Sequence, residues 1–175
     1  AFRELNAGKQ LRELDLRRSA DRDEFLALAR HADLVVEGFR PGVMARLGLG
    51  WETLHTLNPR LVVAAISGYG QRSPWSQRAG HDINYIAMAG VLEQIATVDG
   101  EPALPNFQIG DLLGGTQAAL SGLLAALFGA QRSGQGRFVD ISMTHEVWRH
   151  HVLARHALAS TGTMPVPGRD LLSGG

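Results

Sequence analysis

The chain contains no cysteine, which excludes disulfide frameworks, thiolate zinc sites and cysteine nucleophiles. It also has no excess of charge, because 17 Lys+Arg residues balance 17 Asp+Glu residues in a chain of 175 residues. Nucleic-acid binders, and proteins held on anionic lipid by charge, normally carry a basic excess. We therefore expect neither nucleic acid nor a membrane as a partner. The hydrophobic content of 45% argues against disorder.

Lysine is almost missing, since Lys9 is the single lysine among the 17 basic residues. An anion bound by this protein is thus expected to meet forked guanidinium groups, although genomic base composition explains the same bias. Long apolar runs are missing too. The most apolar stretch, residues 112–130, holds several glycines and polar residues, and it predicts a buried amphipathic helix instead of a membrane span. The first twenty residues show no targeting signal, and the expected location is the cytoplasm.

Strand-like and helix-like segments alternate along the chain. The first part predicts a strand at 11–16, a helix at 21–31, a strand at 33–37, helices at 41–46 and 51–57, and a buried strand at 61–66. The second part predicts loops at 67–80 and 97–108, helices at 81–96, 111–130 and 144–160, and a strand at 137–143. This order is typical of a parallel sheet covered by helices, so the predicted fold class is α/β.

Several common catalytic motifs are incomplete. Gly68 and Gly70 open a possible dinucleotide loop that lacks its third glycine. His145 stands five and six residues before His150 and His151, whereas a helical zinc site needs a spacing of four. No Gly-x-Ser-x-Gly elbow is present, which weakens a hydrolase interpretation. We expect no metal site and assign the histidines to a surface or an interface.

Three short motifs have a chemical interpretation beside a purely structural one. Residues 37–42 follow a predicted strand and offer Phe39 and Arg40 to an anion, but the same pattern is typical of a turn. His81 is placed at a predicted helix start, where the dipole favours the neutral, proton-accepting form; a capping cluster looks the same. Asp111 begins the long predicted helix, as many N-cap aspartates do.

These motifs recur in one order in a known family. They are LDLR at 14–17, EGFRPG at 37–42, ARLGLG at 45–50, NPRLV at 58–62, ISGYGQ at 66–71, GHDINY at 80–85, GDLLGG at 110–115 and GQGRFVDISM at 134–143. With them the chain resembles the class III CoA-transferase (CaiB/BaiF) family, and within it the α-methylacyl-CoA racemase branch. The resemblance implies a Rossmann-like parallel sheet with flanking helices, part of the large domain of an intertwined dimer.

The resemblance also implies site residues. The catalytic pair is His81 and Asp111, which occupy the places of the family's histidine and aspartate. The implied CoA-binding residues are Leu14, Asp15, Leu16, Arg17, Gly38, Phe39, Arg40, Arg46, Gly80, His81, Asp82, Ile83, Asn84 and Tyr85. The expected partners are an acyl-CoA, which is the substrate, and a second copy of the chain. No separate cofactor is expected.

His81 distinguishes the two activities of the family. Inverting a carbon beside a thioester requires one group to remove the α-proton and another to return it on the opposite face, and His81 and Asp111 meet this need. We expect backbone N–H groups at the start of the Asp111 helix to stabilise the enolate. The alternatives are a CoA-transferase in which Asp111 forms an acyl anhydride, and a non-catalytic CoA-binding or dimerisation module.

The length of the chain limits these expectations. In the family, a first strand precedes the position of Ala1, and a second, smaller domain follows the position of Gly175. We therefore expect residues 1–175 to form a partial large domain with both catalytic residues and part of the CoA site. By itself, such a piece is expected to be inactive.

Overall fold

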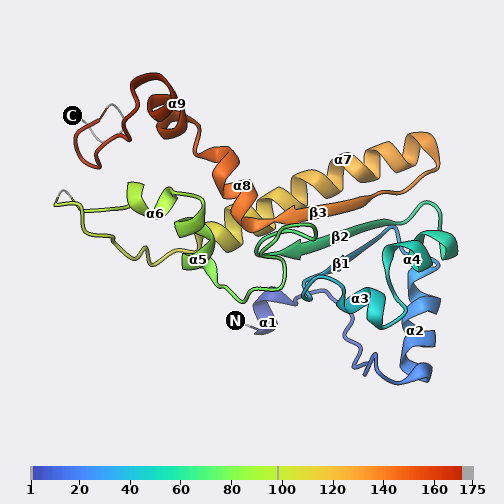
Figure 1. Cartoon of the computed structure of the whole chain (residues 1–175). Coiled ribbons are helices and arrows are strands. Elements are labelled where there is room, and N and C mark those ends of the chain that lie inside the picture. The colour runs from blue at the N-terminus through green and yellow to red at the C-terminus, as the bar shows by residue number, and fades with distance from the viewer. Residues whose placement is uncertain (1, 98, 171–175) are drawn as a thin grey trace.

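A sheet of three parallel strands forms the centre of the protein, seen in a computed structural model that describes residues 2–97 and 99–170 (Figure 1). The strands β1 (Leu34–Glu37), β2 (Val62–Ser67) and β3 (Phe138–Ser142) lie in the order β1-β2-β3. Val35 of β1 is in register with Val63 of β2. The predicted α/β class and parallel sheet are confirmed.

Helices cover both faces of the sheet and extend beyond one end of it. They are α1 (Phe2–Leu5), α2 (Ser19–Ala29), α3 (Val43–Arg46), α4 (Trp51–Leu57), α5 (Asp82–Met88), α6 (Val91–Gln94), η1 (Gly110–Gln117), α7 (Ala118–Ser133), α8 (Met143–His150) and α9 (Val152–Thr161). In Figure 1, α7 runs along the sheet, α2 to α4 gather on the other side, and α5, α6, α8 and α9 lie past the strand tips. The strands therefore point toward the helices that hold the candidate site.

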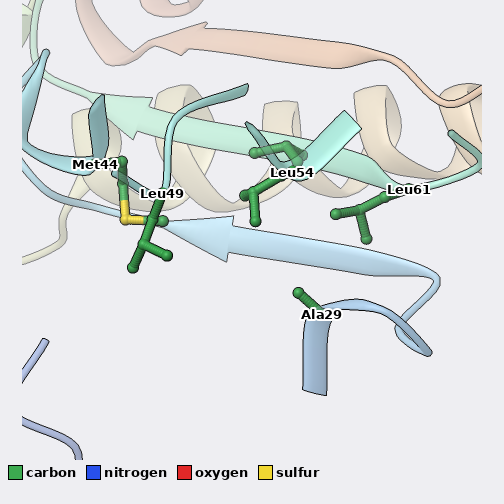
Figure 2. Close-up of a cluster of buried hydrophobic side chains, with 6 residues drawn as sticks. Ala29, Met44, Leu49, Leu54 and Leu61 are labelled. Carbon is green, nitrogen blue, oxygen red and sulfur yellow. The ribbon is translucent and has the colours of Figure 1, made fainter. Parts of the chain in front are cut away.

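Strand β2 is buried on both faces, as its unbroken apolar run predicts. Val63 faces the α2 to α4 side, where Ala29, Met44, Leu49, Leu54 and Leu61 form one aliphatic cluster (Figure 2). Val62 and Ala64 face the opposite side, where Leu123, Ala126 and Ala130 of α7 cover them. Successive strand residues point to opposite faces, so one short segment joins two cores.

The strand predicted at 11–16 is wrong. This segment is irregular, and the backbone N–H of Asp15 donates to the Asp21 carboxylate at 2.8 Å instead of to a neighbouring strand. The alternating pattern does correctly indicate a partly buried side chain, because Leu16 packs against the cluster on the α2 to α4 side of the sheet. A strand needs a partner backbone for its hydrogen bonds, and the described residues place none beside this segment.

The long helix predicted from residue 111 exists, but its geometry differs from the expectation. It begins at Gly110 as a π-helix, η1, and continues as α7 to Ser133. One face of α7 packs on the sheet, while Leu120, Leu124 and Phe128 are half or more exposed on another. The helical stretch Gly110–Ser133 is long and apolar enough to cross a membrane, by length and composition alone. Core helices of soluble proteins have the same properties.

The helix predicted at 144–160 is divided in two. Helix α8 ends at His150 and α9 begins at Val152, because His151 between them leaves helical geometry with a ψ of 47°. Below this break, Val147 of α8 packs with Ile86 and Ala89 from α5 and the residue after it. This third cluster joins α5, α6 and α8 beyond the strand tips.

Candidate active site

The segments that leave β1 and β2 meet at the carboxyl edge of the sheet, where α/β proteins commonly bind ligands. The turn after β1 contains Pro41, and the loop after β2 contains Gln77. The Gln77 side-chain amide donates to the Pro41 carbonyl at 3.1 Å, which joins the two segments. The EGFRPG motif is therefore joined to the loop that leads into the GHDINY motif, although the two motifs are far apart in the sequence.

His81 is the residue immediately before α5, as the sequence predicts. Its backbone is extended, and its N–H donates to the side-chain oxygen of Asn84 at 2.9 Å, which closes the first turn of the helix. The imidazole is exposed. Asn84, predicted as a CoA-binding residue, thus has a structural task in setting the position of His81.

Tyr69 and Tyr85 support the loop that precedes His81. The Tyr85 hydroxyl donates to the Gly80 carbonyl at 2.6 Å, and the Tyr85 ring meets the Tyr69 ring edge-on at a centroid distance of 5.4 Å. A Cβ atom on Gly80 would lie only 2.8 Å from atoms of both tyrosines, and one on Gly68 would collide with the Tyr85 ring. These glycines are required for close packing against the aromatic rings.

Asp111 lies in the first turn of η1, and it is not the N-cap that a simple helix start predicts. Its backbone N–H donates to Oδ2 of Asp82 at 2.9 Å, and its carbonyl accepts the Thr116 hydroxyl at 3.3 Å. Within the described residues, its own carboxylate oxygens accept no hydrogen bond. The side chain is therefore available to a substrate. π-Helical segments are often found at functional sites.

The expectation that amides at the start of this helix stabilise an enolate is wrong for the two nearest ones. The Asp111 amide is taken by Asp82, and the Leu112 amide donates to the Gln108 carbonyl at 3.3 Å. Backbone donors that already have partners at these distances cannot serve a substrate oxygen without first breaking those bonds.

His81, Asp82 and Asp111 form one electrostatic unit. Burial is the main cause that raises the pKa of the Asp111 carboxyl, the negative charge of Asp82 raises it further, and the charge of His81 lowers it. The pKa of Tyr85 is raised too, chiefly by burial and also by Tyr69, Asp111 and Asp82. A carboxyl shifted upward is better suited to exchange protons near neutral pH than an ordinary aspartate.

A pocket of about 370 Å³ opens beside this unit. His81, Asp82 and Ile83 form one wall, and residues 104–108 form the other. Leu104 and Phe107 in that segment are 77% and 62% exposed. The pocket thus joins a proton-transfer group to apolar surface that is open to solvent.

The predicted CoA-binding arginines differ in their surroundings. Arg17 is exposed and forms a bidentate pair with Asp15, with nitrogen to oxygen distances of 2.8 and 3.0 Å, and this pairing lowers the pKa of Asp15. Arg40 and Arg46 are exposed, and in the described part of the chain neither has an acidic partner within 4.0 Å. Arg40 and Arg46 are therefore exposed guanidinium groups without an acidic partner among the described residues, unlike Arg17.

The predicted CoA-binding residues of the first part of the chain lie on two segments, residues 14–17 and the turn after β1. Gly38 and Phe39 follow β1, where the Phe39 amide donates to the Glu37 carboxylate at 2.7 Å and the Phe39 ring is 45% exposed. Leu14 and Leu16 are partly buried, and Leu16 packs on the cluster that contains Met44 of α3. In the described residues, no hydrogen bond or ion pair joins the arginines to His81 or Asp111. The structure brings His81 and Asp111 close to each other, with the predicted CoA residues Asp82, Asn84 and Tyr85 beside them, and it shows no polar contact from this group to the arginines in the described residues.

The histidines after β3 do not converge. His150 contacts the Glu146 carbonyl through Nδ1 at 2.7 Å, and the ring of His145 lies 5.6 Å from the ring of Trp148. Among residues 2–97 and 99–170, no group of three or more potential metal ligands is found.

The contribution of the Asp82 carboxylate is not visible in the sequence. The GHDINY motif predicts that Asp82 binds CoA. In the structure, its carboxylate accepts the backbone N–H of Asp111, 29 residues further along the chain. The one available signal is its place directly after His81, at a predicted helix start. That position does not show that Asp82 accepts a hydrogen bond from Asp111, because the loop between Asp82 and Asp111 has no regular pattern.

Comparison with known proteins places these features in a family. A family model described as CoA-transferase family III matches residues 1–172. The chain is 42% identical over 139 residues to the alpha-methylacyl-CoA racemase of Mus musculus, covering 79% of this chain and 36% of that protein. It is 38% identical over 143 residues to the acetyl-CoA:oxalate CoA-transferase of Acetobacter aceti, covering 81% and 36%.

A solved structure agrees with the sequence comparison. The crystal structure of a CaiB/BaiF family protein from Brucella suis matches with a TM-score of 0.86 at 26% identity, covering 93% of this chain and 43% of that one. The chain belongs to CoA-transferase family III, a family whose members include racemases as well as CoA-transferases. It spans about a third of the length of the curated relatives it matches.

Proposed function

We propose that the protein containing this chain is a 2-methylacyl-CoA racemase, which inverts the α-carbon of an acyl-CoA by transferring a proton between His81 and Asp111. The observation that carries the proposal is the pairing of these two side chains at adjacent helix starts, with the charge of His81 acting on Asp111. Both side chains are free to meet a substrate, since the imidazole is exposed and the carboxylate accepts no hydrogen bond from the described residues.

In the proposed reaction, one group of the pair removes the α-proton and the other supplies a proton to the opposite face of the carbon. The C–H bond breaks, its electrons enter the thioester enolate, and the new C–H bond forms as the second group gives up its proton. His81 acts as base for one epimer and Asp111 for the other. The raised pKa of Asp111 supports this exchange, because the carboxyl must be found in both protonation states.

The remaining predicted residues are assigned to the coenzyme. Arg40 and Arg46 are proposed to hold the phosphates of CoA, since forked guanidinium groups suit phosphate oxygens and these two lack an acidic partner in the part of the chain described here. Arg17 joins them only where a phosphate competes with Asp15. The apolar wall at Leu104 and Phe107 is proposed to receive the acyl chain. A second copy of the chain is proposed to complete the site, and the cytoplasm remains the expected location.

The racemase is tested in the full-length protein that contains this chain, incubated with one epimer of a 2-methylacyl-CoA in D2O. Deuterium is expected at the α-carbon together with formation of the other epimer, followed by NMR. His81→Ala should lower the rate by about 100-fold or more, because general acid–base catalysis typically contributes 10²–10⁴. Arg60→Ala, an exposed change after α4, serves as the control with an unchanged rate.

The CoA-transferase is the second candidate, supported by relatives named as CoA-transferases at identities similar to that of the racemase. In that reaction the Asp111 carboxylate attacks the thioester, releases the CoA thiolate and forms an acyl anhydride. Movement of CoA to an added carboxylic acid, with no deuterium uptake and with activity retained in His81→Ala, would replace the racemase proposal. Binding of CoA with neither reaction would favour a non-catalytic module.

A further inference from the structure

We propose that Asp82 is a positioning residue for the reaction: its carboxylate anchors the backbone of Asp111 and places a negative charge beside the reacting carboxyl. This inference rests on the proposed function and goes beyond it, because Asp82 is predicted only as a CoA-binding residue and has no part in the proposed proton transfer. Asp82 touches neither of the reacting atoms in the proposed scheme.

The first observation is the hydrogen bond itself. Asp82 Oδ2 accepts the Asp111 N–H at 2.9 Å, which joins the start of α5 to the start of η1 across 29 residues. An amide in the first turn of a helix has no acceptor within that helix. Asp82 therefore caps a helix that is distant in the sequence, and it fixes the peptide that carries the reacting carboxyl.

The second observation is close packing at Gly110. A Cβ atom added there would lie 3.2 Å from both the carbonyl oxygen and Oδ2 of Asp82, and 3.3 Å from Cβ of Tyr85. The absence of a side chain at Gly110 thus lets η1 approach α5 closely enough for the hydrogen bond. Since His81 directly precedes Asp82, one short segment of backbone determines where both proton-transfer groups lie.

The third observation is charge. In the described residues, Asp82 has no cationic partner within 4.0 Å, so a nearby ion pair does not neutralise it. Its charge raises the pKa of Asp111, and the charge of His81 opposes this effect. Besides Asp82, the elements packed on η1 hold other titratable groups, which are Tyr85 on α5, Arg132 on α7, Asp140 on β3, and His145, Glu146, Arg149 and His150 on α8; none of these is a cause of the Asp111 shift.

These observations predict separate effects of geometry and charge. Asp82→Asn keeps an oxygen that accepts the Asp111 amide and removes the charge, so Asp111 should titrate at lower pH while its amide stays protected. Asp82→Ala removes both the acceptor and the charge, so hydrogen exchange at the Asp111 amide should become about tenfold faster or more. The matched control is Asp33→Asn, an exposed carboxyl before β1 that should change neither quantity.

The deciding experiment is an NMR titration of the 175-residue chain, combined with hydrogen exchange at the Asp111 amide, and it needs no enzymatic activity. Asp111→Asn identifies the Asp111 carboxyl signal. The inference is overturned if Asp111 titrates at the same pH in the chain with Asp82→Asn as in the unchanged chain. Should Asp82→Ala fail to fold, the Asn variant alone still decides. If the racemase proposal were wrong, this NMR measurement would still test the role of Asp82. Failure of the racemase proposal and failure of the Asp82 inference are therefore distinguishable.

The full-length protein supplies a second readout. For the epimer whose proton Asp111 removes, Asp82→Asn should move the acid limb of the kcat profile to lower pH. Without the Asp82 charge, the Asp111 carboxyl ionises at lower pH, and only the ionised form can act as the base. For the opposite epimer, the alkaline limb should move to lower pH as well, because Asp111 must then donate. KM for the acyl-CoA should stay within about twofold. A rate that falls equally at all pH values, without movement of either limb, would show a merely structural role and contradict the inference.

Discussion

The sheet with its two helical layers and the helices beyond the strand tips are built in different ways. In the sheet, residues 62–65 of β2 are at most 3% exposed and are enclosed by aliphatic side chains on both faces. Around the candidate site, Met88, Leu104 and Phe107 are exposed, and single hydrogen bonds set the geometry: Asp82 and Asn84 each accept one from a backbone N–H, and Tyr85 donates one to a backbone carbonyl. The first region is held by close packing on both faces of the sheet. In the second, a smaller aliphatic cluster of Ile86, Ala89 and Val147 joins the helices, and individual polar contacts set the positions of the site residues. Changes in the first should cost stability, whereas changes in the second should cost position and protonation.

The largest expected loss of stability comes from the sheet region. Leu54→Ala should lower the free energy of unfolding by about 2–5 kcal/mol, because Leu54 is fully buried and the cluster cannot collapse completely into the space left. Urea unfolding of the chain measures the change. The control is Leu124→Ala on α7, which is 59% exposed and should cost much less. Equal losses for the two variants would contradict the conclusion that buried volume carries the stability of the sheet region.

An intermediate effect is expected where η1 packs on α8. A Cβ atom on Gly114 would lie 2.5 Å from the Met143 carbonyl oxygen and 2.9 Å from Cγ2 of Val147. Gly114→Ala should therefore destabilise the chain by about 1–3 kcal/mol, measured by thermal and urea unfolding. Gly129→Ala on α7 is the matched control, since open space surrounds that position, and alanine in a helix should stabilise by about 0.5–1 kcal/mol. The same sign for both variants would show that the packing at Gly114 is looser than described.

The smallest expected effect is a gain in stability at the reacting carboxyl. The folded chain raises the pKa of Asp111, so the folded state holds that proton to higher pH than the unfolded state does. Stability contributed by the protonated form is present at low pH and is lost as pH rises through the raised value. Asp111→Asn should thus stabilise the chain slightly at neutral pH, by well under about 1 kcal/mol because the group is partly exposed.

Urea unfolding between pH 4 and pH 8 measures that gain. The difference between Asp111→Asn and the unchanged chain should grow as pH rises, and Asp33→Asn should show no such trend. A gain that is largest at low pH would reverse the sign and contradict the direction of the Asp111 shift.

The regular elements were well predicted wherever a local pattern was sufficient. The helix at 51–57 is observed at those residues, and the apolar run 61–66 becomes β2 within one residue at each end. The segment 11–16 failed, because alternation shows which side chains seek burial and says nothing of a neighbouring backbone. The π-helical start at Gly110 was missed as well, since its sequence is compatible with an ordinary helix and the packing of Gly114 and Gly115 against Met143 arises only in the fold.

The candidate site divides in the same way. The motifs by themselves determined which residues are candidates, namely His81 and Asp111 for proton transfer and the arginines for anion binding, and the alternation of strands and helices predicted the parallel sheet that carries them. Only the tertiary structure decided that Asp82 holds Asp111, that Arg17 is paired while Arg40 and Arg46 lack an acidic partner among the described residues, and that Asn84 positions His81. The physical reason is the separation along the chain over which each interaction acts. Hydrophobic periodicity and helix starts depend on neighbours in the sequence, whereas a hydrogen bond across 29 residues and the field of an unneutralised carboxylate depend on distances that only folding creates.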